Sequence, residues 1–386
     1  MRPRRLAIAY VHYGDQSGVT PSVWRALSEL GHDVQLVQAT GALEPRDPAT
    51  RRLRPRARVA LHLALAAIRY GRRGLQHRWN TPYAFDAHSR GAGEGLRALA
   101  RRPDLVLQNG ALFSPGLPAP YPYALLVDHT RALAMKSPPW PGAGLPAPLD
   151  YGAAWHAREA EVYRNARVIA AFSENTARSL KEDYAVSPER IRVVGAGANV
   201  FPETAPRCDD GKTLLFLGKD FARKGGPILL DAFERLRRVM PKARLLVAGP
   251  PQPPPLPERV FFLGGASFDE VPPLLAQTTA LVLPTLREPF GLAFLDAMAC
   301  AVPCVATRVE AVPEIVEDGV TGLLVPPGDP VALAAALEHL LSDPARAREM
   351  GRRGRERVAE RFLWSHAAAR LAQALADAGG GRVPAA

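Results

Sequence analysis

The stretch that decides the fold is ALVLPTLREPFGLAFLDAMACAVP, residues 280–303. It opens with four apolar residues, 280–283, which is typical of a short strand buried on both faces. The chain then passes Glu288 and Pro289 and enters an apolar helical pattern over 290–300, and proline is favoured at the first position of a helix. We therefore predict a strand, a loop and a helix, the repeating unit of an α/β sheet.

The start of this helix predicts a site for an anion. The backbone N–H groups of Phe290, Gly291 and Leu292 would lack partners inside the helix, and the helix dipole favours negative charge there. Gly291 also lets a ligand approach the backbone closely. Asp296 lies eight residues after Glu288, about 12 Å along a helix. Two carboxylates beside an anion site suit a nucleotide-sugar, which carries hydroxyls on both sides of a diphosphate. The alternative is a helix with an acidic start and one exposed aspartate.

The rest of the chain repeats this unit. Apolar runs typical of buried strands lie at 6–11, 34–37, 105–107, 124–127 and 168–172, and then at 214–217, 244–248, 260–263 and 280–283. Helical patterns alternate with them at 22–30, 155–165, 175–184, 228–239, 290–300 and 331–341, and a long helical stretch closes the chain at 344–376. A Gly-, Pro- and Asp-rich segment, which has neither the helical nor the strand periodicity of apolar residues, separates the two sets of strands. The pattern predicts two doubly wound α/β domains. We place them at 1–195 and 212–360, with a linker at 196–211 and a C-terminal helix and tail at 361–386.

Composition limits the class of protein. The chain has 386 residues, of which 47% are hydrophobic and 23% charged, so overall disorder is excluded. Three cysteines, Cys208, Cys300 and Cys304, exclude a disulfide scaffold, indicate a reducing compartment and form no zinc-site pattern. No run of about 18 apolar residues is present that would span a membrane, and 6–11 fits a first strand better than a signal peptide. We therefore expect a cytoplasmic protein without a metal site.

The net charge of +11 lies entirely in the first half of the chain. Residues 1–200 hold 27 basic and 16 acidic side chains, whereas 201–386 hold 22 of each. This asymmetry suggests that the first domain faces something anionic. The alternative is a coding bias that leaves solvated arginines, because arginine outnumbers lysine 43 to 6.

One apolar run in this basic half, 59–68, is flanked by basic residues. They are Arg51, Arg52, Arg54, Arg56 and Arg58 before it, and Arg69, Arg72, Arg73, His77 and Arg78 after it. Such a run suits a membrane interface. An ordinary core helix with solvated ends is the alternative.

A second candidate site follows the strand at 214–217. The loop LGKDFARKGG, residues 217–226, contains Gly218, Lys219 and Lys224, and ligands of open α/β sheets bind where strands end. Lysine offers a compact positive charge, and two of only six lysines stand in this loop. The alternative is that both are simply solvated. The spacing of a P-loop is absent from the sequence.

Together these motifs resemble family-4 retaining glycosyltransferases of the glycosyl transferases group 1, which have the GT-B fold. The resemblance covers about residues 190–376. It rests on the pair Glu288 and Asp296, the Gly218–Gly225 loop, PEIVEDG at 313–319, TGLLV at 321–325, and FSENTAR at 172–178 leading to PERIRVV at 188–194. In the first half the order of elements fits, and 14–19 stand where family members carry a Gly-Gly loop. The fold so implied is two Rossmann-like domains facing a central cleft, with a C-terminal helix crossing back to the first domain.

The resemblance implies a retaining hexosyltransferase that moves a sugar from a nucleotide-diphosphate sugar to a glycan, a lipid-linked sugar or a small molecule, without a cofactor. Glu288 would bind the donor sugar. Asp296 would hold the ribose hydroxyls. The amides of Phe290, Gly291 and Leu292 would bind the phosphates.

The same resemblance assigns roles to the remaining candidates. Lys219 and Lys224, beside Gly218, would neutralise the diphosphate leaving group as a metal does elsewhere. His129, just after the strand at 124–127, would face the reacting sugar, with His12 as its rival. The donor phosphates or the acceptor would lie against Gly18 and Val19, across the cleft.

Three positions depart from the family pattern. Asp296 replaces a glutamate, Lys219 replaces an arginine, and Arg308-Val-Glu310-Ala311 replaces a small Gly pair before Pro313. None removes a charge, so we expect an active enzyme. The three departures leave the identity of its donor open.

Three other functions compete with sugar transfer. One is a nucleotide-sugar epimerase on the same fold, and another is a non-catalytic sugar-nucleotide-binding protein, which would have lost the donor loops that are present here. The third is a nucleic-acid binder, suggested by the pI of about 9.9 but supported by no recognition motif. We expect no nucleic-acid partner. We do expect peripheral contact of the first domain with the inner membrane face.

Overall fold

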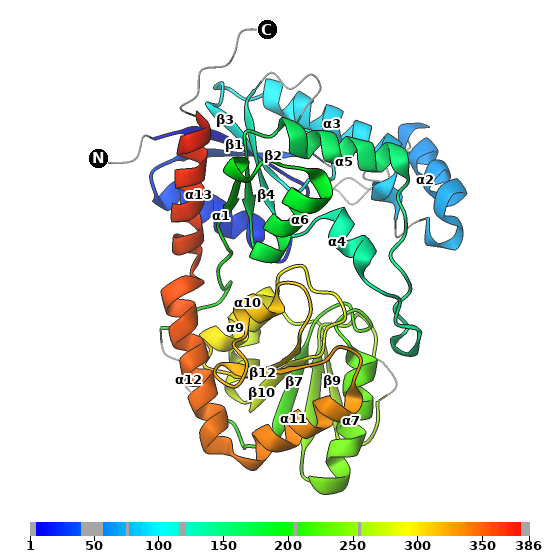
Figure 1. Cartoon of the computed structure of the whole chain (residues 1–386), viewed down its shortest axis with the longest axis vertical. Coiled ribbons are helices and arrows are strands. Elements are labelled where there is room, and N and C mark those ends of the chain that lie inside the picture. The colour runs from blue at the N-terminus through cyan, green and yellow to red at the C-terminus, as the bar shows by residue number, and fades with distance from the viewer. Residues whose placement is uncertain are drawn as a thin grey trace.

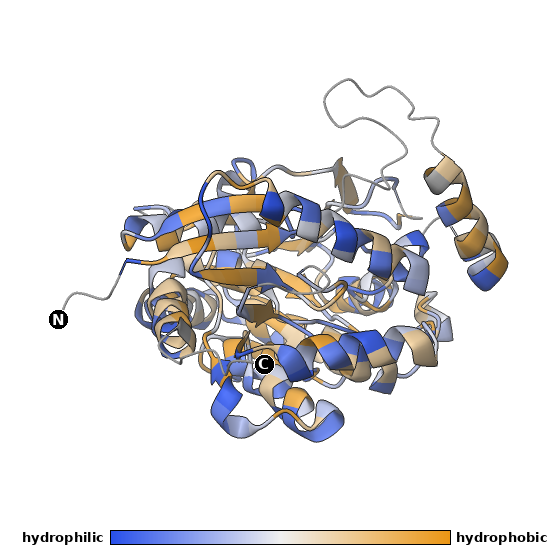
Figure 2. Cartoon of the chain, turned by 90° about the horizontal axis from the view of Figure 1, so that it is seen from above, coloured by the Kyte–Doolittle hydropathy of each residue, from blue (hydrophilic) through white to orange (hydrophobic). Residues whose placement is uncertain are grey.

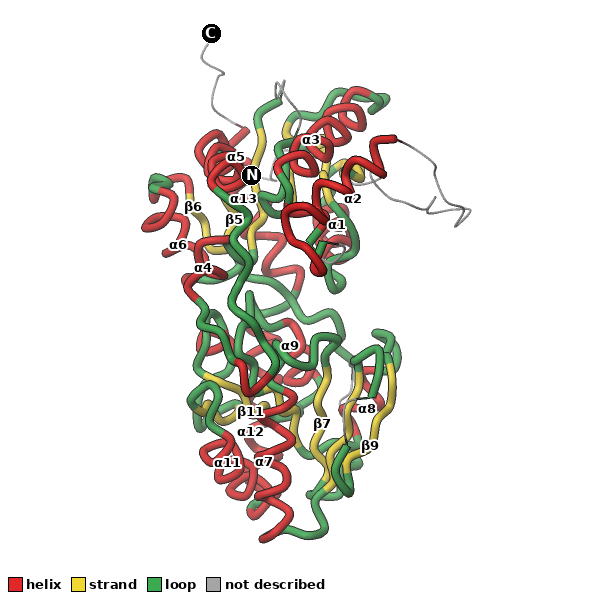
Figure 3. Tube along the Cα trace, turned by 90° about the vertical axis from the view of Figure 1, so that its right-hand side faces the viewer, coloured by secondary structure: helices red, strands yellow, loops and turns green. Residues whose placement is uncertain are grey.

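The computed structural model describes residues 5–39, 57–74, 77–115, 121–203, 207–253 and 256–379. It contains two parallel six-stranded sheets, one in each half of the chain, which lie one above the other along the long axis of the molecule (Figure 1). Seen from the side, helices flank the strands of each sheet (Figure 3). The predicted α/β class with two doubly wound sheets is confirmed.

The first sheet has the strand order β2-β1-β3-β4-β5-β6. Its strands are β1 (Ala7–His12), β2 (Asp33–Gln38), β3 (Leu105–Asn109), β4 (Tyr123–Val127), β5 (Val168–Ala171) and β6 (Ile191–Val193). Its helices are α1 (Val19–Glu29), α2 (Ala57–Tyr70), α3 (Pro82–Arg97), α4 (Arg131–Lys136), α5 (Ala153–Asn165) and α6 (Glu174–Tyr184). The strands β3, β4 and β5 are buried along their whole length, as their continuous apolar runs predict.

The second sheet has the strand order β12-β11-β10-β7-β8-β9. Its strands are β7 (Thr213–Leu217), β8 (Arg244–Ala248), β9 (Val260–Gly264), β10 (Ala280–Leu283), β11 (Cys304–Thr307) and β12 (Gly322–Val325). Its helices are α7 (Gly226–Val239), α8 (Val271–Ala276), α9 (Leu292–Ala299), α10 (Val312–Ile315), α11 (Pro330–Ser342) and α12 (Pro344–Arg361). The strand β10 and the helix α9 that follows it are almost fully buried.

Each sheet reverses its strand order at one point. In the first sheet β1 lies between β2 and β3, and in the second β7 lies between β10 and β8. Ligands of open α/β sheets bind at such points, beyond the carboxyl ends of the strands. The loops after β1, β7 and β10 therefore stand where a ligand site is expected, and two of them are the motif loops of the sequence.

The C-terminal helices join the two halves. The helix α12 packs on α9, whereas α13 (Trp364–Gly379) packs on α1 and β5 of the first half (Figure 1). The predicted crossing back to the first domain is therefore confirmed. The single helical stretch expected over 344–376 is wrong in one respect, because it is interrupted at Phe362. The carbonyl oxygen of Phe362 instead accepts a hydrogen bond of 2.9 Å from the backbone of Ala198 in the linker.

One local expectation about α9 is also wrong. The helix begins at Leu292 rather than at Phe290, because Gly291 adopts a left-handed conformation with a φ of 118° and caps it. Pro289 and Phe290 thus belong to the preceding loop, and Glu288 and Asp296 do not share one helix.

Among the described helices, none combines the length and apolar composition that a membrane span needs.

Candidate active site

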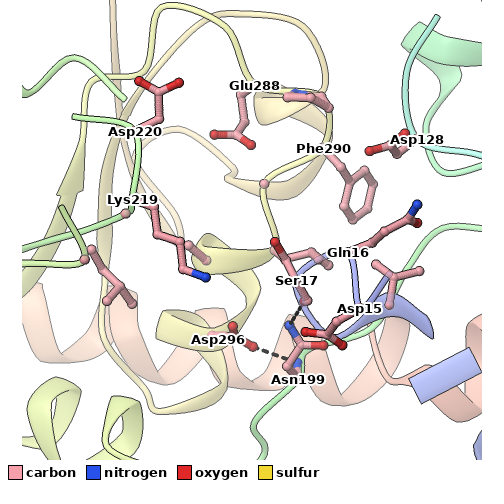
Figure 4. Close-up of a pocket in the computed structure, with 18 of the residues that line it drawn as sticks. Asp15, Gln16, Ser17, Asp128, Asn199, Lys219, Asp220, Glu288, Phe290 and Asp296 are labelled. Carbon is pink, nitrogen blue, oxygen red and sulfur yellow. Dashed lines mark hydrogen bonds between the residues drawn. The ribbon is translucent and has the colours of Figure 1, made fainter. Parts of the chain in front are cut away.

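A cavity of about 710 Å³ lies between the two halves, at the points where the strand orders reverse. Its size falls in the range of small-molecule sites. Figure 4 shows the first half contributing Asp15, Gln16, Ser17 and Asp128, opposite Lys219, Asp220, Glu288, Phe290 and Asp296 from the second half. Among the predicted residues, Val19, Gly218, Lys219, Lys224, Glu288, Phe290, Gly291, Leu292 and Asp296 line this cavity.

Lys224 and Glu288 form a buried ion pair in the wall of the cavity. Lys224 is 9% exposed and Glu288 5%, and the Lys224 ammonium hydrogen-bonds Oε2 of the carboxylate. The guanidinium of Arg223 stands 3.8 Å from the same oxygen. Burial lowers the pKa of Lys224, although Glu288 opposes that shift. The sequence assigned these two side chains to different parts of the donor, whereas the structure shows that each also fixes the other.

Lys219 stands in a different environment. Its side chain is exposed and reaches into the cavity (Figure 4). Gly218 precedes it directly at the end of β7 and packs against the stem of Lys224, so that an added Cβ would lie 3.1 Å from that side chain. The loop thus presents two ammonium groups to the cavity, that of Lys224, which Glu288 holds, and that of Lys219, which makes no hydrogen bond or ion pair to the described residues.

Asp296 faces the cavity from the second turn of α9. It is 5% exposed, and its Oδ1 accepts hydrogen bonds from the backbone N–H groups of Asn199, at 2.7 Å, and Val200, at 3.2 Å. Burial raises the pKa of Asp296 to about 7, against the lowering effect of these two hydrogen bonds. The carboxylate that the sequence assigned to ribose therefore also anchors the linker between the halves.

The loop after β1 holds Gly18 and Val19. Gln16, Ser17 and Gly18 all have positive φ angles, and Gly18 caps α1 with a φ of 87°. A Cβ on Gly18 would lie 2.8 Å from Oδ1 of Asn199, so the position requires glycine. Asn199 also donates a hydrogen bond of 2.9 Å to the carbonyl oxygen of Ser17, which Figure 4 marks. The start of α1 is thereby aimed at the cavity, with Val19 in its wall.

His129 follows the cavity-lining Asp128 in the chain and contacts the second half, but it is not among the residues that line the cavity. Its Nε2 is 3.1 Å from Oε1 of Glu310, and the other oxygen of Glu310 accepts the backbone N–H of Glu288. Its neighbour Asp128 lines the cavity, and the enclosing protein raises the pKa of that carboxyl group. The rival residue His12 accepts a hydrogen bond of 3.4 Å from the backbone of Gly14, and it too is absent from the lining of the cavity. Of the two histidines, His129 is the one with a side-chain contact to the second half.

Sequence reasoning missed several residues of this site. Asp128 could have been found, because it precedes His129 at the end of a strand. Arg223 stands in the lysine loop, but nothing in the sequence separates it from the many solvated arginines. Asn199 gave no local indication, and Glu310 stood out only as a departure from the family pattern, since the partners of both lie far away in the chain.

No group of three or more His, Cys, Asp or Glu side chains is placed to hold a metal ion among the described residues. Cys300 and Cys304 are buried, and Cys208 is exposed. The thiol of Cys304 donates a weak hydrogen bond of 3.7 Å to the carbonyl oxygen of Phe294. Cys300 and Cys304 thus pack inside the second half, whereas Cys208 does not.

Similarity to known proteins adds to this geometry. Residues 211–343 match the model of the family "Glycosyl transferases group 1". The chain is 35% identical to the alpha-maltose-1-phosphate synthase of Mycolicibacterium smegmatis in an alignment 219 residues long, which covers 48% of this chain and 56% of that protein. It is 32% identical to the D-inositol 3-phosphate glycosyltransferase of Thermobispora bispora in an alignment 249 residues long, which covers 57% of this chain and 58% of that protein. The chain thus spans little more than half the length of either relative.

Two solved structures cover nearly the whole chain. A sucrose-phosphate synthase from Thermosynechococcus elongatus superposes with a TM-score of 0.70 at 22% identity, covering 96% of this chain and 98% of that one. HepE of Anabaena, solved in complex with UDP-glucose, gives a TM-score of 0.62 at 15% identity, with 97% and 100% covered. The two halves of the chain together therefore have the GT-B fold, as the resemblance implied.

Proposed function

We propose that this protein is a metal-independent, retaining glycosyltransferase of family 4 that uses a nucleotide-diphosphate sugar as donor. The observation that carries the proposal is the cavity at the carboxyl ends of β1, β7 and β10, in which cationic side chains and a helix start face carboxylates. HepE, which shares the fold, was solved with UDP-glucose. The donor base, the sugar and the acceptor are not assigned.

The diphosphate would lie between α9 and the β7 loop. The first amides of α9 have no partner inside the helix and attract an anion. Lys219 and Arg223 line the cavity on the other side, with the buried Lys224 behind them. Together they would stabilise the negative charge that develops on the leaving nucleoside diphosphate.

The transferred sugar would lie between Glu288 and the first half. The ion pair with Lys224 fixes the Glu288 carboxylate, which leaves it poised to accept hydrogen bonds from sugar hydroxyls. Asp128 lines the other side of the cavity, and His129 follows it in the chain. At the opposite end, Asp296 would accept the ribose hydroxyls. In this arrangement the anomeric carbon would lie at the interface of the two halves, where an acceptor held by the first half could reach it.

A thermal-shift screen tests the proposal directly. UDP, GDP, ADP and their glucose or mannose derivatives would be added to the full chain, because a ligand at 100 times its Kd stabilises the folded state by about 2.7 kcal/mol. The variant Lys219→Ala is the matched control, since its exposed side chain makes no hydrogen bond or ion pair among the described residues. Stabilisation of the wild type and a reduced shift in Lys219→Ala are expected. The absence of a shift with every nucleoside diphosphate would refute the proposal.

Turnover separates a transferase from an epimerase. A transferase releases free nucleoside diphosphate in step with product formation, whereas an epimerase interconverts the nucleotide-sugar without net release. Retention would be read from the anomeric proton of the product by NMR. An inverted product would refute the retaining mechanism and leave sugar transfer in place.

We also propose that the first half contacts an anionic membrane through α2, where a lipid-linked acceptor would be met. Leu61, 49% exposed, and Ile68, 82% exposed, lie with Ala64 on one face of this helix. The opposite face is buried, with His62 stacked on Trp79 at 5.1 Å. The helix stands at the right-hand edge of Figure 2 and is largely apolar. Arg51, Arg52, Arg54 and Arg56 lie outside the described residues, as do the side chains of Arg58 and Arg72.

Vesicle binding tests the membrane contact. The wild type should sediment with phosphatidylglycerol vesicles at low salt and less so with phosphatidylcholine, because each basic residue near an anionic surface contributes about 1 kcal/mol. The double variant Leu61→Ser/Ile68→Ser should lose this binding. Val331→Ser, which changes an exposed apolar residue of α11, is the control. Equal sedimentation of all three proteins would show that α2 does not make the membrane contact. If the wild type did not bind at all, the membrane contact would be refuted and only a soluble acceptor would remain.

A further inference from the structure

Glu310 occupies a backbone position that suits glycine. Its φ is 45°, in the left-handed region that residues with a Cβ rarely adopt. Such strain persists only where the surrounding contacts hold it, and it gathers at functional sites. The chain thus places a charged side chain where a small residue would be free of strain.

The carboxylate of Glu310 joins the two halves at the edge of the cavity. Oε1 lies 3.1 Å from Nε2 of His129 in the first half, and Oε2 accepts the backbone N–H of Glu288 in the second. Both side chains of the bridge are 14% exposed. One carboxylate therefore links the histidine that faces the sugar position to the loop that carries Glu288.

The charge state of Glu310 fixes the direction of the hydrogen bond. Although desolvation opposes it, the contacts with His129 and the Glu288 amide hold the pKa of Glu310 below its usual value. An ionised carboxylate can only accept hydrogen bonds, so Nε2 of His129 must carry the proton. When the ring is neutral, Nδ1 is then a hydrogen-bond acceptor, and no hydrogen bond joins it to the described residues.

We propose that Glu310 is a positioning residue that acts through His129. When the halves meet, its carboxylate holds the imidazole in the Nε2–H form and leaves Nδ1 for the substrate, in the way a carboxylate orients a histidine in other enzymes. This inference rests on the proposed sugar transfer. It assigns a role to the residue by which this chain departs from the family pattern.

A second carboxylate on the same segment provides a built-in control. Glu314, in α10, accepts hydrogen bonds of 2.8 Å from the backbone N–H groups of Glu174 and Asn175 at the start of α6. It therefore bridges the halves as Glu310 does, but without contact to His129. A purely structural role in holding the halves together would make the two glutamates equivalent.

Histidine ring NMR on the ligand-free full chain tests the assignment. The ring nitrogens of His129 would be identified by their loss in His129→Gln. The wild type should show the Nε2–H tautomer, Glu310→Gly should show a mixture of tautomers, and Glu314→Gln should match the wild type. Unchanged His129 signals in Glu310→Gly would overturn the inference. Because no substrate is needed, a failed ligand screen would count against sugar transfer alone.

Kinetics with the donor that the thermal-shift screen identifies complete the test. Glu310→Gly should lower kcat about 10-fold or more with little change in donor KM, because general acid–base groups contribute at least that much. Glu310→Gln, which keeps one acceptor oxygen, should recover part of the loss. In a His129→Gln background Glu310→Gly should have no further effect, since the two residues act as a unit. An equal loss of kcat with and without His129 would overturn the inference.

Discussion

Replacing Lys224 by alanine should damage stability and donor binding together. The change leaves the 5%-exposed carboxylate of Glu288 without the ammonium group that now pairs with it. Removing one partner of a buried ion pair typically costs about 3–5 kcal/mol. Arg223, 3.8 Å from the same oxygen, remains and should keep the loss near the lower limit, about 3 kcal/mol. For a domain of 150–250 residues this corresponds to a fall of about 6–12 °C in melting temperature.

Lys219→Ala is the matched comparison. Lys219 is exposed, so its loss should change the free energy of unfolding by no more than about 0.5 kcal/mol. Each lysine should nevertheless contribute a charge-assisted contact to a diphosphate, about 1.5–3 kcal/mol, or roughly 10- to 100-fold in Kd. Calorimetric titration with UDP measures the effect on diphosphate binding, and thermal melting of the same preparations measures the effect on stability. The two measurements therefore separate these contributions.

A compensating variant sharpens the test. Lys224→Met combined with Glu288→Leu removes both charges, and apolar replacement of a buried ion pair is often neutral or stabilising. The double variant should regain most of the lost stability and still fail to turn over donor. If Lys224→Ala melted like the wild type, the reasoning from burial would be wrong. If the double variant were active, the assignment of Glu288 to the donor sugar would fail instead.

Three further outcomes are expected. Because burial raises the pKa of Asp296 to about 7, the folded chain keeps this proton while the unfolded chain loses it near pH 4. The stability it contributes is therefore fully present below pH 4 and is lost as pH rises toward 7, by up to about 4 kcal/mol. Urea unfolding at pH 5 and pH 8 should show this loss in the wild type and not in Asp296→Asn, and parallel behaviour would contradict it. Glu288→Gln should keep binding of bare UDP in calorimetry and lose turnover, whereas weakened UDP binding would assign Glu288 to the nucleotide. Activity should survive EDTA, and its abolition with recovery on adding Mg²⁺ or Mn²⁺ would contradict phosphate neutralisation by lysines alone.

The sequence predicted the buried strands well, because a strand covered on both faces must be apolar throughout. It missed β6, β11 and β12, whose short apolar runs are interrupted or bounded by Arg192, Thr307 and Gly322. It also missed α3, whose glycines weaken the helical pattern. There, Gly91 and Gly95 pack so closely on the segment around β2 that an added Cβ would lie 2.7 Å from the Ala39 carbonyl oxygen and 2.6 Å from Val37. Tertiary packing thus overrides the low helix propensity of glycine.

The residues of the candidate site also fall into those that the sequence could indicate and those that it could not. Residues that act through one short segment, such as Lys219 and Lys224, could be found because their motif is local in sequence. Pairs that meet only after folding could not, because His129 and Glu310 are 181 positions apart and Asn199 and Asp296 are 97 apart. Assignment of roles to the predicted residues stays a prediction, as do the domain boundaries.

Hydrogen bonds on both sides of the cavity couple its occupation to the placement of the two halves. On one side, Asn199 donates its side-chain amide to Ser17 of the first half and its backbone N–H to Asp296 of the second. On the other, Glu310 meets His129. Each such hydrogen bond contributes only about 1 kcal/mol net, because water can take the place of either partner. The closed arrangement of the two halves is therefore held by a few weak contacts. A ligand shifts such an equilibrium only by the difference in its affinity for the two states. A donor whose ribose bonds Asp296 and whose sugar meets His129 makes contacts to both sides that only the closed state offers. Donor binding should therefore raise the population of the closed arrangement, in which Glu310 already contacts His129, before the acceptor reacts.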